Sequence, residues 1–355
     1  MSYAGLRCLV TGGLGFIGSN LANRLVELGA EVTVVDPMLE GCGGNHHNLA
    51  PSGARIRVVQ ADIGEPHVFR DDLAAADVIF NLAGEISHIH SMQFPDRDLK
   101  VNTVSQLHFL LGCRELPKKP RIVYASTRQV YGAPKYLPVD EAHPIQPVDF
   151  NGVHKFAATS YHMMLTRAGM LDAAVVRLTN VYGPRIALDV TCQGFLSTFI
   201  RRMVLRQQIE IFGDGNQLRD PMYVDDAVDI FLRLGIARDL RSRSFNAGGP
   251  EVHTVAAIAR LASRIGGCPE PIFRPFPPDR KPIDIGSYRS DSRRAHGELG
   301  WHPVVSLEDG LRRTFAYYEA ELPRYLAPGG SEPACRMPEH TGPRRRLQYL
   351  TVQGD

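Results

Sequence analysis

The sequence has little of several features that would point at once to a class of protein. Its 355 residues carry a net charge of +2, too small to create a strong general attraction to nucleic acid or to a membrane surface. No apolar run reaches the roughly 18 residues that a membrane-spanning helix needs. The six cysteines are scattered without Cys-x-x-Cys spacing, which disfavours a zinc site or a disulfide framework. We therefore expect a cytoplasmic protein with reduced thiols, no bound metal, and no nucleic-acid or membrane partner.

Glycine, in contrast, is abundant, and three glycines near the amino end stand at a regular spacing. Gly12, Gly15 and Gly18 form G-x-x-G-x-x-G between a strand-like run and a helix-like run. Glycine permits a tight turn and a close approach of backbone to a pyrophosphate, which the helix N-terminus then attracts. The next strand-like run, 31–35, ends in Asp36, whose carboxylate can bind a ribose 2′-hydroxyl and would repel a 2′-phosphate. The pattern predicts binding of NAD in preference to NADP.

The order of strand-like and helix-like runs predicts the fold class. Strands are expected at 7–10, 31–35, 56–60, 77–82, 121–126 and 173–178, with helices between them, notably at 17–29, 98–115 and 152–168. This alternation predicts an α/β fold with a Rossmann-type, doubly wound parallel sheet. Beyond about residue 180 the alternation becomes irregular. We expect an NAD-binding domain over 1–180, to which parts of about 219–248 return, a smaller α/β substrate lobe over 181–325, and a flexible tail over 326–355.

Further motifs follow the glycine loop in a fixed order. They include Ala61-Asp62-Ile63, Asn81-Leu82-Ala83-Gly84, an R-x-x-N-x-Y-G-P-R segment over 177–185, and FGDGNQLRD over 212–220. Over about residues 5–320 the chain thereby resembles the extended short-chain dehydrogenase/reductase family of NAD-dependent nucleotide-sugar epimerases and dehydratases. The resemblance implies an enzyme that binds NAD and a nucleoside-diphosphate sugar, and a homodimer formed through the helices at 98–115 and 152–168. The cofactor residues that it implies are Gly12, Gly15, Phe16, Ile17, Gly18, Asp36, Asp62, Ile63, Leu82, Ala83 and Lys155.

The catalytic segment departs from this family. Its members carry a Ser or Thr hydroxyl and then Tyr-x-x-x-Lys, in which the lysine holds the nicotinamide ribose and lowers the tyrosine pKa. Here Thr127 takes the hydroxyl position and Lys155 the lysine position, but the residue four before Lys155 is Asn151. An asparagine amide does not titrate and cannot act as a general base. A positioned acid–base group contributes about 10² to 10⁴ in rate, so its loss matters.

Three explanations for Asn151 stay open at this point. Another group transfers the proton, with Glu85 as the first candidate and Tyr131, Asp149, His88 and His154 as weaker ones. Alternatively, the chain performs a non-redox isomerisation of a nucleotide sugar, such as a pyranose–furanose mutase reaction. In the third explanation the protein is catalytically silent and only binds NAD or a nucleotide sugar.

The residues after Thr127 favour one class of reaction. Family dehydratases and decarboxylases carry a glutamate here, whereas this chain has Arg128-Gln129, and Gln129 cannot abstract a proton. We therefore predict epimerisation through transient hydride transfer, with a non-standard base. On the substrate side Arg219 and Asn180 are expected at the diphosphate, because a guanidinium recognises phosphate bidentately. Arg128 could bind a carboxylate or phosphate of the substrate, and Tyr131 is a further predicted contact.

Overall fold

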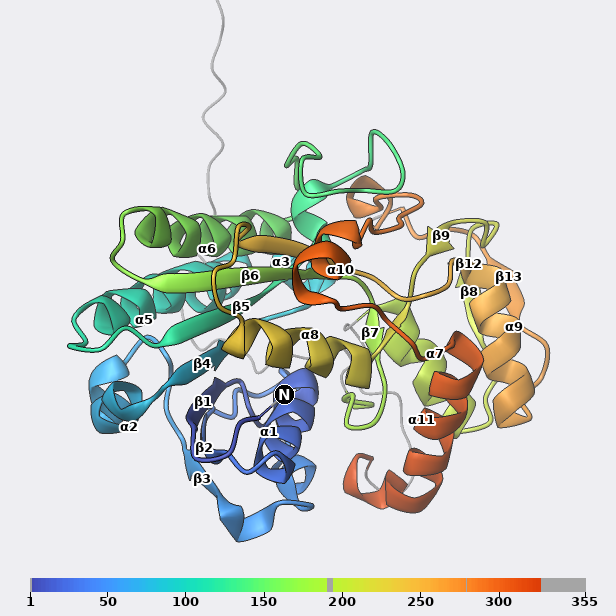
Figure 1. Cartoon of the computed structure of the whole chain (residues 1–355). Coiled ribbons are helices and arrows are strands. Elements are labelled where there is room, and N and C mark those ends of the chain that lie inside the picture. Colours follow the sequence, from blue (N-terminus) through green and yellow to red (C-terminus); the bar gives the residue numbers. More distant parts are fainter. Residues whose placement is uncertain (1, 190–193, 279, 327–355) are drawn as a thin grey trace, which may run out of the picture.

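A seven-stranded parallel sheet forms the centre of the computed structural model, which describes residues 2–189, 194–278 and 280–326 (Figure 1). The strands lie in the order β11-β6-β5-β4-β1-β2-β3, and all neighbours are parallel. Their bounds are β1 Arg7–Thr11, β2 Glu31–Val35, β3 Ile56–Val59, β4 Val78–Asn81, β5 Arg121–Thr127, β6 Asp172–Leu178 and β11 Ser244–Ala247. The Rossmann-type α/β prediction is confirmed. Several of these strands are rich in Val and Ile, a composition typical of strands that are buried on both faces of a sheet.

Helices cover both faces of this sheet. Helices α1 (Phe16–Glu27) and α8 (Val224–Ile236) pack together on one face, while α2 (Arg70–Ala75), α5 (Ser105–Arg114) and α6 (Phe150–Arg167) lie on the other (Figure 1). Alternate residues of β5 divide between the two layers, because Val123 joins the α1–α8 side and Ile122 joins the α5 side. The segment of about 219–248, which was predicted to return to this domain, thus supplies β11 to the sheet and α8 to the helices that cover it.

The helix expected at 98–115 is longer and interrupted. It starts with α4 (Pro95–Leu99), continues through a π-helical turn over Lys100–Val104, and ends with α5. The irregular turn places polar side chains against the chain that leaves β4. Asn102 Nδ2 donates to the Glu85 carbonyl oxygen at 3.0 Å, and Gln106 Nε2 donates to that of Ala83 at 2.9 Å. These bonds fix the loop beside the pocket described below.

The chain after β6 builds short two-stranded pairs and helices beside the sheet (Figure 1). The pairs are β7 (Val181–Tyr182) with β10 (Met222–Tyr223), β8 (Glu210–Phe212) with β13 (Ile272–Arg274), and β9 (Leu218–Arg219) with β12 (His253–Thr254). The remaining helices are α3 (His88–Gln93), α7 (Phe195–Val204), α9 (Val255–Gly266), α10 (Arg293–Leu299) and α11 (Leu307–Glu321).

Two sequence expectations concern residues that are only partly described. Four cysteines are free, namely Cys8, Cys42, Cys113 and Cys268, whereas Cys192 and Cys335 lie outside the described residues. The predicted flexible tail, 326–355, also falls outside the described residues apart from Leu326. Within the described ranges, no helix combines the length and the apolar character needed to cross a bilayer. The division of the chain into two lobes stays a prediction.

Candidate functional site

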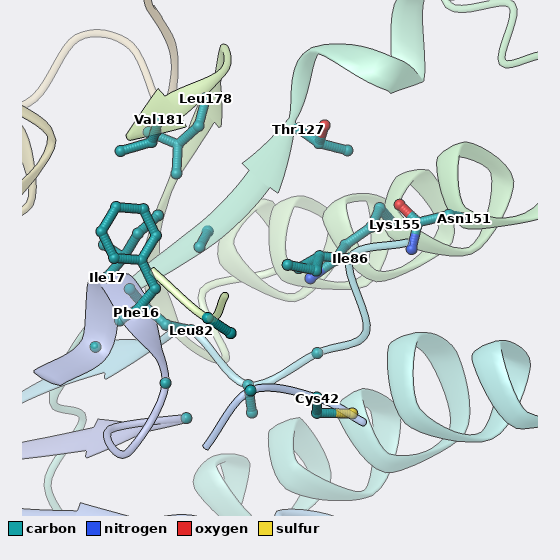
Figure 2. Close-up of a pocket in the computed structure, with 18 of the residues that line it drawn as sticks. Phe16, Ile17, Cys42, Leu82, Ile86, Thr127, Asn151, Lys155, Leu178 and Val181 are labelled. Carbon is teal, nitrogen blue, oxygen red and sulfur yellow. The ribbon is translucent and has the colours of Figure 1, made fainter. Parts of the chain in front are cut away.

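One pocket lies at the carboxyl ends of the central strands, where the strand order reverses between β1 and β4 (Figure 2). In doubly wound sheets this switch point is where ligands bind. Every predicted cofactor residue lines the pocket: Gly12, Gly15, Phe16, Ile17, Gly18, Asp36, Asp62, Ile63, Leu82, Ala83 and Lys155. Four predicted catalytic or substrate residues also line it: Thr127, Arg128, Asn151 and Asn180. Glu85, Tyr131 and Arg219 do not.

The glycine loop forms a cradle that only glycine fits. A Cβ on Gly18 would lie 2.2 Å from the Gly12 carbonyl oxygen, and Gly12 itself has φ +68°. Helix α1 starts after Gly15 without a side-chain cap and without an acidic residue in its first turn. Its first backbone N–H groups are therefore available to an anion, and the helix dipole favours negative charge there. The cradle fits the pyrophosphate of a dinucleotide.

Two carboxylates stand beside this cradle. Asp36 follows β2 and is buried, and its two oxygens accept hydrogen bonds from the Leu14 amide at 3.0 Å and the Met38 amide at 2.9 Å. Burial raises the pKa of Asp36, while these two hydrogen bonds act in the opposite direction. Asp62 Oδ1 accepts from the Gly64 amide at 2.7 Å. Each oxygen keeps a further lone pair, so both carboxylates can accept a hydroxyl or amino group of an adenosine.

Lys155 is a buried amine on α6 that faces the pocket without a carboxylate partner. Among the described residues none of the ion pairs includes it, and its Nζ lies 5.5 Å from the centre of the Tyr124 ring. Burial lowers the pKa of Lys155 to about 8, although the Asp98 carboxylate acts to raise it. The amine lies close against Gly84, where an added Cβ would be 2.4 Å from Nζ. Figure 2 shows Lys155, Asn151 and Thr127 around the same cavity.

Asn151 belongs to a buried hydrogen-bond network. Its Nδ2 donates to the Glu85 carbonyl oxygen and to Asp98 Oδ2, both at 2.9 Å. The other oxygen of Asp98 lies 2.7 Å from His154 Nδ1. The residue at the family's tyrosine position thus ties the start of α6 to α4 and to the loop after β4. His154, a weaker candidate base, has its Nδ1 occupied in this network.

Glu85 does not present its carboxylate to the pocket. The Arg97 guanidinium contacts that carboxylate, and Cys42 Sγ donates to it at 3.6 Å. Arg97 lies 12 residues further along the chain, on α4. This pairing does not support the prediction that Glu85 is the base.

Tyr131 and Arg219 do not line this pocket, and the role of Arg219 at a diphosphate stays a prediction. Tyr131 is fully buried, where its Oη donates to Asn246 Oδ1 at 2.7 Å and accepts from Arg177 Nη1 at 2.6 Å. Arg219 Nη1 donates to the carbonyl oxygens of Leu218 at 2.8 Å and Gly286 at 2.5 Å. Neither residue lines the pocket, so the structure does not support Tyr131 as a substrate contact. For Arg219, the buried Nε has no hydrogen-bond partner.

Four polar side chains in the described part of the pocket wall have a buried atom without a hydrogen-bond partner, namely His88, Arg128, Gln129 and Asn180. Arg128 is 6% exposed, lies over the Tyr288 ring at 5.0 Å, and has an unpartnered Nη1. Asn180 Oδ1 is buried and unpartnered as well. Burying a polar group without a partner costs about 1–3 kcal/mol, so such groups point to a polar ligand. Thr127 Oγ1 accepts from the Gln129 amide at 3.2 Å while its residue lines the same wall.

Sequence reasoning missed part of the wall. The wall also contains Cys42, Gly43, Gly44 and Ile86, together with Gly194, Leu196 and Ser197 at the start of α7. His88, only a weaker candidate, lines the pocket too. The glycines that follow Asp36 were a usable signal for the first of these. The segment at the start of α7 offered only the single Gly194. Within the described ranges, no group of three His, Cys, Asp or Glu residues could hold a metal ion.

Comparison with known proteins gives consistent results. A model described as the NAD dependent epimerase/dehydratase family matches residues 8–248. A UDP-glucose 4-epimerase of Mycolicibacterium smegmatis is 33% identical over 317 residues, covering 88% of this chain and 98% of the relative. A UDP-glucuronic acid decarboxylase 1 of Xenopus tropicalis is 31% identical over 328 residues, covering 89% of this chain and 73% of the relative.

Solved structures of similar fold include two proteins bound to nucleotide sugars. A UDP-glucose 4-epimerase of Thermotoga maritima with UDP-glucose has a TM-score of 0.81 at 31% identity, covering 89% of this chain and 99% of that one. MoeE5 in complex with UDP-glucuronic acid and NAD has a TM-score of 0.77 at 26% identity, covering 88% and 99%.

Proposed function

The chain belongs to the NAD-dependent epimerase/dehydratase family as an NAD-dependent, nucleotide-sugar epimerase-like enzyme, and from this premise we propose that it inverts one hydroxyl-bearing carbon of a nucleoside-diphosphate sugar. UDP-hexoses are the first substrates to test, because relatives over most of the chain are UDP-glucose 4-epimerases. One observation carries the proposal: a single pocket joins the dinucleotide cradle to Thr127 and Lys155, while no carboxylate follows Thr127.

The residues present fit NAD, because the glycine cradle leaves no space for a Cβ and the start of α1 has no acidic side chain. NAD, when bound, supplies reversible hydride acceptance. The Gly12–Gly18 loop would hold the pyrophosphate, and Asp36 would accept from the adenosine ribose. Lys155 would donate to the nicotinamide ribose, and Thr127 would hydrogen-bond the reacting sugar hydroxyl. Asn180 Nδ2 would donate to an oxygen of the nucleotide-sugar diphosphate, while its unpartnered Oδ1 would accept from a ligand hydroxyl.

Gln129 favours epimerisation over elimination. It is 5% exposed, and its Nε2 donates to Asp149 Oδ2 at 3.3 Å. An amide cannot remove a carbon-bound proton, so the position lacks the base that dehydration would need. This argument separates the proposal from the decarboxylase activity named for other relatives.

We also propose a homodimer through the helices at 98–115 and 152–168, where α4 and α6 contact each other. Exposed large apolar side chains in and beside these helices are Leu99, Val104, Phe150, Val153, Phe156 and Met164. Pairing of this α4–α6 face with the same face of a second copy would cover such side chains, and symmetric pairing is the commonest form of oligomer.

The test uses purified protein, NAD and a panel of UDP-, dTDP- and GDP-linked hexoses and uronic acids, with products followed by NMR. A substrate deuterated at the inverted carbon should react more slowly and keep its deuterium on that carbon. Lys155→Met is the inactive control, and Lys281→Met, which removes an exposed charge, is the matched active one. Ring contraction to a furanose would support a mutase instead. Tight binding with no turnover of any sugar would mean that the protein only binds.

A further inference from the structure

The proposed function needs a group that takes and returns a proton at the sugar hydroxyl, and Asn151 cannot be that group. The titratable side chains that line the pocket, within the described ranges, are Asp36, Cys42, Asp62, His88, Arg128 and Lys155. Asp36 and Asp62 stand at the dinucleotide cradle. Burial and the nearby Glu85 raise the pKa of Cys42 to about 12, so its thiol stays protonated. A guanidinium does not deprotonate in proteins. Lys155 is assigned to the nicotinamide ribose in the proposed function, so His88 remains.

His88 stands where it can face the sugar end of the pocket. It is the first residue of α3, directly after the loop from β4, and α3 packs against both α4 and α6. Its Nδ1 is buried, makes no hydrogen bond, and lies 3.5 Å from Asp149 Oδ2, within ion-pair distance; 31% of the side chain is exposed, and the residue lines the pocket. Nε2, unlike Nδ1, is not a buried atom without a partner, so Nε2 is the ring nitrogen that is open to a ligand.

Asp149 is held firmly in place. It is the N-cap of α6, two residues before Asn151, and its Oδ1 accepts from the Gly152 amide at 2.6 Å. Its Oδ2 faces His88 and also accepts from Gln129 Nε2 at 3.3 Å. An imidazole with Nδ1 toward a fixed carboxylate and Nε2 toward the substrate is the arrangement in which histidine works as a general base.

The charges around His88 suit this role. Burial lowers the pKa of His88, and the Arg128 guanidinium lowers it as well, whereas the carboxylates of Asp149 and Asp98 raise it. Because burial is the largest influence, the imidazole is neutral near pH 7 and ready to accept a proton. The two carboxylates then stabilise the imidazolium that forms.

We propose that His88 is the acid–base residue of this chain in place of the family's tyrosine, with Asp149 as its positioning residue; this rests on the proposed function. NAD, when bound, would supply the acceptor for the carbon-bound hydrogen and its electron pair, and His88 Nε2 would take the hydroxyl proton, which leaves a ketone. On return of the hydride to the other face of that carbon, Nε2 would give its proton back to the same oxygen. No proton or electron is gained or lost over the cycle.

The test compares His88→Gln and Asp149→Asn with the wild type and with His67→Gln, which removes an exposed histidine elsewhere. We expect kcat to fall about 100-fold or more in His88→Gln, as for loss of a general base, with little change in the Kd of the nucleotide sugar. In the wild type kcat should fall as pH drops through the pKa of the imidazole, and this dependence should vanish in His88→Gln. Added imidazole should restore part of the lost rate.

NMR titration of the His88 ring in the protein without substrate gives a second readout that does not depend on turnover. Asp149→Asn keeps an acceptor for the α6 cap but removes the charge, so the His88 pKa should fall. If His88→Gln keeps the wild-type rate and pH profile, or if the His88 pKa does not respond to Asp149→Asn, the proposal is overturned while the epimerase function stands. If the wild type turns over no nucleotide sugar, the proposed function fails, and this proposal with it.

Discussion

Lys155→Met should make the cofactor-free protein more stable while it removes NAD binding. The Lys155 amine is buried and has no ion-pair partner among the residues that the structure describes, and burial lowers its pKa from 10.5 to about 8. A tenfold change in a proton-binding constant corresponds to about 1.4 kcal/mol, so this difference corresponds to about 3 kcal/mol. Methionine has a similar length and carries no charge, so the folded state should gain roughly this amount at pH 7.

The pH dependence follows from the direction of the pKa change. Below about pH 8 the amine is charged in both the folded and the unfolded chain, and the penalty on the folded state is complete. Between about 8 and 10.5 only the unfolded chain binds the proton, so the free energy of unfolding of the wild type rises with pH relative to Lys155→Met. The difference should fall from about 3 kcal/mol at pH 7 to about 1.4 kcal/mol at pH 9.5.

Urea denaturation of both proteins at several pH values, with NAD removed by dialysis, measures this difference. Lys281→Met is exposed and should change stability by less than about 0.5 kcal/mol. Calorimetry should show that NAD binds the wild type and Lys281→Met, and not Lys155→Met. A Lys155→Met protein that is no more stable than the wild type at pH 7, or a difference that does not change with pH, would refute the reasoning.

Three further outcomes follow. Gly18→Ala should weaken NAD binding at least about tenfold, because its Cβ would lie 2.2 Å from the Gly12 carbonyl oxygen and the strain of overpacking is about 1–3 kcal/mol. Gly297→Ala is the control, because a Cβ there meets nothing within 4 Å, and it should bind NAD normally in the same calorimetry. Asp36→Ala should weaken NAD by about 10- to 100-fold and remove the preference over NADP, measured by titrating both cofactors. Val153→Glu should convert the dimer to a monomer in light scattering, and an unchanged mass would count against the α4–α6 face.

The six strands before residue 180 could be predicted because each is a short apolar run bounded by polar or glycine-rich chain, a pattern that a sheet covered on both faces requires. The pocket residues at or just after strand ends, such as Asp36, Asp62 and Thr127, were predictable because parallel strands bring their carboxyl ends to one edge of the sheet. Glu85 was also placed correctly after β4. The sequence pattern does not indicate that Arg97 pairs with Glu85, because Arg97 reaches Glu85 only when α4 packs beside the loop.

Arg219 and Tyr131 illustrate the same limit at longer range. The carbonyl oxygen of Gly286 that Arg219 binds lies 67 residues away, and the Asn246 that Tyr131 binds lies 115 residues away. Local sequence patterns can predict the role of a residue, but they do not indicate which distant group forms hydrogen bonds with it. The same holds for Gly194, Leu196 and Ser197, which come to the pocket only through the packing of α7.

The role of Asn151 is explained by its hydrogen bonds rather than by its position four residues before Lys155. Its amide nitrogen donates two hydrogen bonds, to the Glu85 carbonyl oxygen and to Asp98, and a tyrosine hydroxyl has only one proton to donate. The bond to Glu85 holds the loop that leads, three residues later, to His88. Asparagine in place of the family's tyrosine therefore removes a base from the pocket, and it also fixes the chain segment that carries the His88 imidazole into the pocket. For this reason Asn151→Ala should impair catalysis by misplacing His88, even though Asn151 moves no proton itself.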